Sequence, residues 1–206
     1  GGWNYSNGQK YYTDAGGKIF RGDWKKIDGK WYSFKGNGVL RQNEFYGVYY
    51  LKADGSMAEN EWIFDKYYNS YFYIKQGAYA RKEWFGSYYL KDGGYMAKSE
   101  FIYDANYKAT YYLSESGQYV GGKWLELNGK KYHFQMDGIL DTNKWIGNYY
   151  VKSDGAMARN EWFFDKNYGS YFYLGEDGKY IGGNRWFQIG GDWFYFIADG
   201  QMASNR

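Results

Sequence analysis

Aromatic residues recur along the chain in short clusters, which polar and glycine-rich segments separate. Residues 60–74 read NEWIFDKYYNSYFYI and residues 160–174 read NEWFFDKNYGSYFYL, so the same pattern returns after 100 residues. Alignment on the glycine that follows each cluster gives ten repeats, spaced 17 to 23 residues apart. Such self-similarity is typical of proteins in which each repeat packs against its neighbours. The anchor glycines are Gly17, Gly38, Gly55, Gly77, Gly94, Gly117, Gly138, Gly155, Gly178 and Gly200.

Each repeat has the pattern of a β-hairpin followed by a loop. It opens with Trp or Phe and continues through a turn such as Asp28-Gly29 or Asn128-Gly129, the strongest short-range hairpin signal. An aromatic strand follows, such as residues 30–34 (KWYSF), and then a polar loop such as residues 52–58 (KADGSMA). No segment shows helical periodicity. The pattern predicts an all-β chain, a solenoid of about ten stacked hairpins that forms a single module over residues 1–206.

Counting back from the anchor glycine separates two faces of the second strand, because alternate side chains of a strand point to opposite sides. The residue four positions before the glycine is apolar in nine of ten repeats, and the residue six before is aromatic in all ten, so we expect this face to form the core. The opposite face carries a residue five before, usually Tyr, and a highly variable residue seven before. A position that varies between Trp and Lys suits a ligand site present in some repeats only. The residues at this position are Lys10, Trp31, Val48, Tyr71, Ser87, Thr110, Lys131, Asn148, Tyr171 and Trp193, of which Tyr71 lies six before its glycine because that repeat is one residue shorter there.

Composition excludes several classes of protein. The chain has 30 Gly and no Pro, so its turns depend on Gly, Asn and Asp. The absence of Cys excludes disulfides and thiolate metal sites. Long apolar runs are missing, so we expect no membrane span, and no signal-peptide pattern opens the chain, as would also hold for a secreted protein whose leader was removed. A net charge of +3 without a basic stripe predicts no nucleic-acid partner.

Residues 23–40 (DWKKIDGKWYSFKGNGVL) carry the pattern Trp, spacer, Gly-Lys-Trp-Tyr-x-Phe, spacer, Gly. This pattern resembles the cell-wall-binding repeat of pneumococcal choline-binding proteins, and the resemblance covers essentially the whole chain. Glucan-binding glucosyltransferases and clostridial toxins have related repeats, but the GSMA, GYMA, GAMA and GQMA loops and the NEWIFD variants favour the choline-binding branch. The resemblance implies hairpins stacked in a left-handed superhelix, with a choline between consecutive hairpins.

The resemblance also implies how choline is held in that family. Two rings of one repeat contact it, and a Tyr and often a Met of the next repeat complete the site. Trimethylammonium has no N–H to donate, so ring faces bind it, at about 0.5–2 kcal/mol for each cation–π contact. A polarizable Met fills the remaining wall.

This arrangement predicts three complete choline sites and one doubtful site. The three sites are Trp24, Trp31, Tyr50 and Met57; Trp62, Tyr71, Tyr89 and Met96; and Trp162, Tyr171, Tyr195 and Met202. The doubtful site has Trp124, Tyr150 and Met157, but Lys131 takes the place of a ring and should repel choline. Trp62 and Tyr71 are nine residues apart, against seven for Trp24 and Trp31, and we expect the longer hairpins to tilt their rings.

Candidate catalytic residues are few. The acidic pairs recur with the repeat, as turn and surface residues do, whereas a glycosidase needs one unique pair. His133 is the only His, so a multi-His metal site is excluded. We therefore expect no enzyme activity, no metal and no cofactor. The acidic pairs are Glu61 and Asp65, Glu100 and Asp104, and Glu161 and Asp165.

The sequence thus predicts a secreted, non-catalytic module that binds phosphocholine of teichoic and lipoteichoic acids and attaches non-covalently to the bacterial cell wall. Two alternatives stay open. One is a glucan-binding or other carbohydrate-binding repeat module, and the other is a surface adhesin or regulator that contacts a host protein while choline binding anchors it to the cell wall. The module could also belong to a larger wall glucosaminidase. Trp186 and Trp193 of the last repeat have no following hairpin, which leaves room for self-association or for further repeats.

Overall fold

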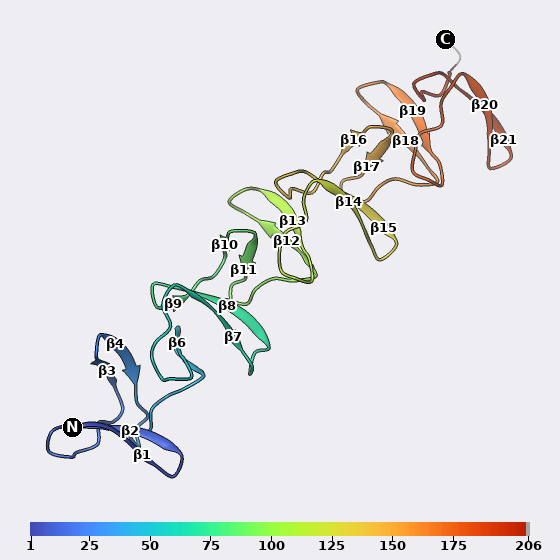
Figure 1. Cartoon of the computed structure of the whole chain (residues 1–206). Coiled ribbons are helices and arrows are strands. Elements are labelled where there is room, and N and C mark those ends of the chain that lie inside the picture. The colour runs from blue at the N-terminus through green and yellow to red at the C-terminus, as the bar shows by residue number, and fades with distance from the viewer. Residues whose placement is uncertain (205–206) are drawn as a thin grey trace. The chain divides into compact units, whose positions relative to one another are not determined.

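The computed structural model describes residues 1–204, and every regular element in that range is a β-strand (Figure 1). Residues 1–204 contain no helix long and apolar enough to cross a membrane. The strands are β1 (Gly2–Ser6), β2 (Gln9–Thr13), β3 (Trp24–Ile27), β4 (Lys30–Ser33), β5 (Glu44–Tyr46), β6 (Tyr49–Leu51), β7 (Glu61–Asp65), β8 (Ser70–Lys75), β9 (Ala78–Tyr79), β10 (Glu83–Phe85), β11 (Tyr88–Leu90), β12 (Glu100–Asp104), β13 (Ala109–Leu113), β14 (Lys123–Leu127), β15 (Lys130–Phe134), β16 (Lys144–Ile146), β17 (Tyr149–Val151), β18 (Glu161–Asp165), β19 (Ser170–Leu174), β20 (Arg185–Ile189) and β21 (Asp192–Phe196).

Consecutive strands pair as antiparallel hairpins, so the predicted all-β hairpin architecture is confirmed. In the described part of the chain, eight hairpins are two-stranded sheets, and two more join through the short strand β9 into one five-stranded sheet with the order β5-β6-β9-β8-β7. The chain divides into two compact units. The first comprises residues 1–99 and 113–118, and the second comprises residues 100–112 and the chain from residue 119 onward. Stacking of all the hairpins into one solenoid stays a prediction.

The short hairpins turn as the sequence predicts. Asp28 and Gly29 both have positive φ, at 48° and 82°, and Asn128 and Gly129 repeat this at 50° and 75°. Positive φ at both central residues defines the type I′ turn, whose twist matches that of the flanking strands. The anchor glycines combine a positive φ with close packing, as Gly55 shows. Its φ is 85°, and a Cβ at this position would collide with the side chain of Leu40 in the preceding repeat.

The core assignment is confirmed at the position four before the anchor glycine, and at the position six before it holds in some repeats only, since Tyr32, Tyr111 and Phe172 are buried. The residue four before the anchor glycine is buried in the nine repeats where it is apolar, as with Leu51 and Phe134. The expected core ring Tyr49, however, is 38% exposed, whereas its neighbour Tyr50, expected to face outward, is only 6% exposed. A hairpin with neighbours on both sides packs both faces of its second strand, so the simple division into an inner and an outer face does not hold.

Consecutive hairpins meet through a repeated ring contact. The opening Trp or Phe of one repeat lies edge-to-face with the ring six before the glycine of the next repeat, or five before in the repeat of Gly77, and ring quadrupoles favour this arrangement. The eight contacts have centroid distances of 4.8–5.5 Å and interplanar angles of 61–75°. They are Trp3–Tyr32, Trp24–Tyr49, Phe45–Phe72 and Trp62–Tyr88 in the first compact unit, and Phe101–Tyr132, Trp124–Tyr149, Trp145–Phe172 and Trp162–Phe194 in the second.

Candidate functional site

The first candidate site is an aromatic cage at the boundary between hairpins β3–β4 and β5–β6. Trp24, Trp31, Tyr49 and Met57 line a cavity of about 260 Å³. Trp24 and Tyr49 lie edge-to-face with centroids 5.2 Å apart, and Trp31 leaves 41% of its surface exposed. The backbone N–H of Met57 donates to the carbonyl of Trp31 at 2.8 Å, which holds the two side chains beside each other. Three rings and a thioether therefore surround an open apolar cavity.

The second cage has the same construction between hairpins β7–β8 and β10–β11. Trp62, Tyr71, Tyr88 and Met96 line a cavity of about 310 Å³, which Ser116 completes. The Trp62 and Tyr88 ring centroids are 5.2 Å apart, and the Met96 N–H donates to the Tyr71 carbonyl at 3.0 Å. Because Tyr71 is almost half exposed, a ligand can reach the cavity from solvent.

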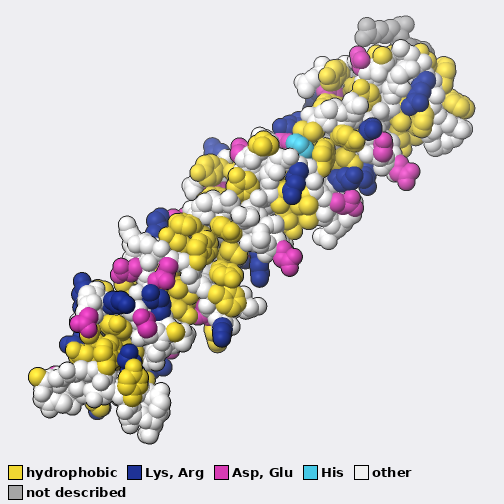
Figure 2. Space-filling model, viewed as in Figure 1, with side chains coloured by type: hydrophobic (Ala, Val, Ile, Leu, Met, Phe, Trp, Pro, Cys, Tyr) yellow, Lys and Arg dark blue, Asp and Glu magenta, His cyan; other side chains and the backbone are white. Residues whose placement is uncertain are grey.

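The third predicted site, between hairpins β18–β19 and β20–β21, has the same contacts. Trp162 lies 6.5 Å from Tyr171 and 4.8 Å from Phe194, measured between ring centroids. The N–H of Met202 donates to the Tyr171 carbonyl at 2.7 Å. Exposed rings of this kind place hydrophobic side chains at the surface among the charged ones (Figure 2). The arrangement matches the first two cages, except that Phe replaces Tyr as the third ring.

The third ring of each cage is not the Tyr that the sequence predicted. Tyr50, Tyr89 and Tyr195 each pack against the opening ring of their own hairpin, with centroids 4.9–5.4 Å apart. In each case the adjacent residue reaches the preceding hairpin, because neighbouring side chains of a strand point to opposite faces. The same holds at the doubtful site, where Tyr149 and not Tyr150 contacts Trp124. The rings that the prediction missed are Tyr49, Tyr88, Phe194 and Tyr149.

This correction has a direct test in the first cage. Tyr49→Leu removes a cage wall, so we expect its variant to bind one choline equivalent fewer than the wild type. Tyr50→Leu alters a buried ring outside the cage and should lower the free energy of unfolding by about 1–3 kcal/mol with unchanged stoichiometry. Calorimetric titration with choline and urea unfolding measure the two quantities. Loss of the site in Tyr50→Leu alone would restore the original assignment.

The longer hairpins keep the ring in the same place. Tyr71 pairs with Phe64, two residues along the strand from the pair Trp62–Tyr73. Trp31 stands in the same relation to Trp24 in the short hairpin, since Trp31 pairs with Lys26 and Trp24 with Ser33. The two additional residues lie in the turn after Asp65, so the longer hairpin keeps the register of the ring, and a tilt of the rings stays a prediction.

The doubtful site differs in its charged surroundings. Trp124 and Tyr149 have centroids 5.5 Å apart, and the N–H of Met157 donates to the carbonyl of Lys131 at 2.8 Å. Lys131 therefore occupies the position of the missing ring. Met157 is buried, unlike the half-buried methionines of the three cages.

His133 pairs with Trp124 across the hairpin and is bound to a buried carboxylate. Its Nδ1 lies 2.5 Å from Asp141, which also accepts from Gln135 at 2.7 Å and contacts the ammonium of Lys144. Burial works against ionisation of Asp141, but these hydrogen bonds and Lys144 hold its pKa below the usual value. The pair therefore has a structural role beside the doubtful site.

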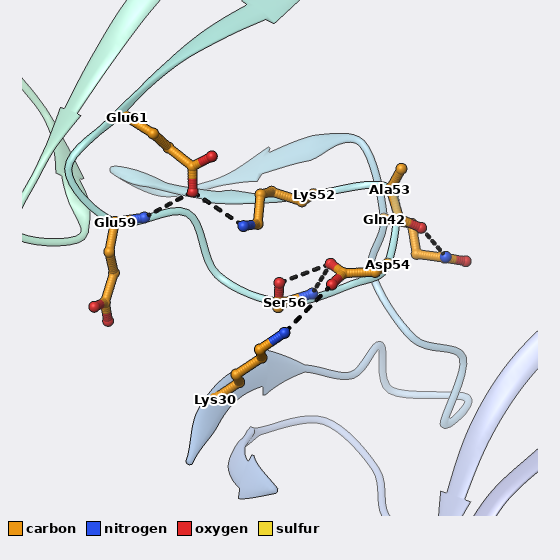
Figure 3. A network of polar contacts seen from close by, with 8 residues as sticks. All are labelled: Lys30, Gln42, Lys52, Ala53, Asp54, Ser56, Glu59 and Glu61. Atoms are coloured by element: carbon orange, nitrogen blue, oxygen red, sulfur yellow. Dashed lines mark hydrogen bonds and ion pairs between the residues drawn. The ribbon is translucent and has the colours of Figure 1, made fainter. Parts of the chain in front are cut away.

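The loop that carries Met57 is fixed by its own side chains (Figure 3). Ser56 donates to Asp54 from its N–H at 2.9 Å and from its hydroxyl at 2.7 Å, and the Lys30 ammonium lies 4.0 Å from the same carboxylate. Burial works against ionisation of Asp54, but Ser56, Lys52 and Lys30 hold its pKa below the usual value. An ordered loop keeps the thioether in position as a cage wall.

The recurring carboxylates serve ion pairs and turns. Glu61 and Glu161 contact Lys52 and Lys152, each at 3.0 Å. The aspartates accept backbone N–H groups in the hairpin turns: Asp65 from Tyr68, Asp104 from Asn106, and Asp165 from Asn167. Within residues 1–204, no group of three or more His, Asp or Glu side chains is arranged to hold a metal ion.

The walls of the cages determine which ligands they suit. The first cage presents ring faces and a thioether, which attract a cation without hydrogen bonds. A quaternary ammonium group has this chemistry, because it carries positive charge and offers no proton. An anion or a fully hydrated metal ion would not be stabilised by such walls.

Two family profiles match the chain. Residues 139–180 match the family described as "Choline-binding repeat", and residues 22–40 and 184–202 match the family described as "Putative cell wall binding repeat".

Three proteins illustrate the similarity. Over 134 residues the chain is 36% identical to a Streptococcus pneumoniae protein described as "Putative endo-beta-N-acetylglucosaminidase", a match that covers 65% of the chain and 14% of that protein. Over 82 residues it is 32% identical to glucosyltransferase-S of Streptococcus mutans, covering 37% of the chain and 5% of the enzyme. The solved structure of the modular autolysin LytC from Streptococcus pneumoniae, in complex with a synthetic peptidoglycan ligand, matches with a TM-score of 0.73 and 46% identity. This match covers 78% of the chain and 37% of LytC, so the chain spans a minor part of each relative.

The fold and the cages together define a class of protein: an all-β chain of hairpin repeats with aromatic cages at the boundaries between hairpins. The chain contains choline-binding and cell-wall-binding repeats of the kind that its relatives carry.

Proposed function

We propose that this chain is a non-catalytic module that attaches to the bacterial cell wall by binding the choline groups of teichoic and lipoteichoic acids. The observation that carries the proposal is the first cage, in which Trp24, Trp31, Tyr49 and Met57 surround one cavity. The second cage and the contacts of Trp162, Tyr171, Phe194 and Met202 repeat this construction. On this proposal the protein acts outside the cell, on the wall surface.

Several weak sites produce firm attachment. A single cage with a few cation–π contacts should bind free choline with a Kd on the order of 1 mM, or about −4 kcal/mol. A polymer that carries many choline groups engages a second cage at a high effective concentration once the first is bound. This multivalency requires the hairpins to stack in a regular array, and we propose the left-handed solenoid of ten hairpins as that array. The repeated ring contacts between successive hairpins support it.

Calorimetric titration with free choline and with dextran tests the function. We expect heat from choline with about three equivalents bound per chain, and no heat from dextran. A chain that bound dextran and not choline would instead be a glucan-binding module, the second candidate, which the match to glucosyltransferase-S favours. Titration with phosphocholine should give the same stoichiometry as choline, because each cage binds the ammonium end.

The module can serve a larger protein. Because the chain corresponds to 14% of the glucosaminidase-like relative, we propose that it anchors a wall hydrolase whose catalytic part lies elsewhere. A host protein or a second copy of the chain is a further possible partner. The exposed rings of Trp186 and Trp193 in the last hairpin are the surface we assign to such contacts.

A further inference from the structure

The boundary between the first two hairpins has the geometry of a cage. Trp3 and Tyr32 lie edge-to-face with centroids 4.9 Å apart and an interplanar angle of 68°, close to the 5.2 Å and 75° of Trp24 and Tyr49. The backbone contact is also the same, because the N–H of Leu40 donates to the carbonyl of Lys10 at 2.8 Å. Two rings and an apolar side chain are therefore placed as in the first cage.

Lys10 occupies the position that Trp31 has in the first cage. Lys10 pairs across the hairpin with Tyr5, which lies two residues after the opening ring Trp3. Trp31 likewise pairs with the residue two after the opening ring Trp24, so Lys10 and Trp31 hold equivalent positions. Its ammonium lies 4.1 Å from the centroid of the Trp3 ring. Within residues 1–204 Lys10 makes no ion pair with a carboxylate, and the only other ring near its ammonium is that of Tyr5, farther away at 5.7 Å.

We propose that this boundary is a further cation cage, which the protein closes with its own Lys10 ammonium. The inference rests on the proposed function, since the site would take the same class of ligand, a quaternary ammonium group. A tethered ammonium competes at a high effective concentration, whereas free choline binds a single cage weakly. Lys10 therefore keeps choline out of this boundary, and the residue seven before the anchor glycine selects which boundaries bind.

The boundary at Phe45 shows a different way to close the site. Phe45 is surrounded by the rings of Tyr50, Tyr68, Phe72 and Tyr79, with centroids 4.8–6.0 Å away. The protein's own rings occupy the space there, so adding another ring would not create a site. Val48, the equivalent of Lys10 at this boundary, provides a matched control.

The test restores the missing ring with Lys10→Trp. We expect this variant to bind one choline equivalent more than the wild type, and the indole N–H signal of Trp3 in its NMR spectrum should shift on addition of choline. In the wild type the Trp3 signal should stay in place while that of Trp24 shifts. The control Val48→Trp should keep the wild-type stoichiometry. A folded Lys10→Trp variant with wild-type stoichiometry and an unshifted Trp3 signal would overturn the proposal.

A second measurement needs no variant at the site. An ammonium over the Trp3 ring places the ε-methylene protons of Lys10 in the ring current, so their NMR signals should lie upfield of those of lysines that face no ring, and further upfield than those of Lys25 and Lys26, which lie 5.0–5.9 Å from rings. Signals at the ordinary lysine position would overturn the proposal, whatever the variant does. Failure of the proposed function would look different, because the wild type would then bind no choline and the Trp24 signal would not move.

Discussion

Replacing Trp31 with alanine is expected to remove one choline equivalent from the chain and to leave its fold intact. Trp31 lines the first cage, so its loss opens one wall and removes a cation–π contact that contributes about 0.5–2 kcal/mol. In a site with a Kd on the order of 1 mM, this loss weakens binding about 2- to 30-fold, so that over a millimolar titration the site no longer fills. Calorimetric titration with choline measures the stoichiometry, and urea unfolding measures the stability.

Val48→Ala is the matched control for this prediction. Val48 occupies the same position of the next repeat and is 41% exposed, as Trp31 is. Both substitutions remove an exposed side chain from the same place in a hairpin, so their effects on stability should be similar and small. Only Trp31→Ala should change the stoichiometry. Equal loss of choline in both variants would show that the hairpin, and not the cage, determines binding.

The hairpins could be predicted from the sequence because their signals are local. Asp28-Gly29 and Asn128-Gly129 adopt the positive φ angles that a two-residue hairpin turn requires, and few other residue pairs do so without strain. The buried position four before the anchor glycine was equally clear, because it stays apolar in nine repeats. These features depend on one strand and one turn only.

The choice between neighbouring rings could not be made in the same way. Tyr49 and Tyr50 are both aromatic and lie on opposite faces of one strand, and each face packs against a different hairpin. The alternation of side chains along a strand predicts that only one of the two rings lines the cage. Which one does so depends on where the neighbouring hairpin packs. The invariant ring six before the glycine was the available signal. An aromatic at every boundary indicates a contact that every boundary makes, and the structure assigns it to the opening ring of the preceding repeat.

The pairing of Met with a ring could be predicted because three of the four methionines two after an anchor glycine follow a repeat with a ring at the variable position, Met157 with Lys131 being the exception. Met57 and Trp31, like Met96 and Tyr71, come together through one backbone hydrogen bond at the boundary. The position of the Lys10 ammonium over a ring could not be predicted, because a lysine in a sequence gives no position for its ammonium. The structure places this charge over the ring of Trp3, where the ligand of a complete cage would lie.

The largest expected loss of stability comes from Gly55→Ala. Gly55 has φ 85°, a region that costs a residue with a Cβ about 1–2 kcal/mol. The added Cβ would also collide with the side chain of Leu40, and overpacking of this kind costs about 1–3 kcal/mol more. We therefore expect the free energy of unfolding to fall by about 2–5 kcal/mol, measured by urea unfolding.

Gly29→Ala separates the two contributions to this loss. Gly29 has nearly the same φ, 82°, but a Cβ there would have no atom of another residue within 4 Å. Its variant should lose only the conformational part, about 1–2 kcal/mol. The double variant Gly55→Ala, Leu40→Ala should be less destabilised than the sum of its single variants, because the collision is gone. If Gly29→Ala proved as destabilising as Gly55→Ala, the anchor glycine would be needed for its backbone angle alone, and close packing against the preceding repeat would not explain why glycine recurs there.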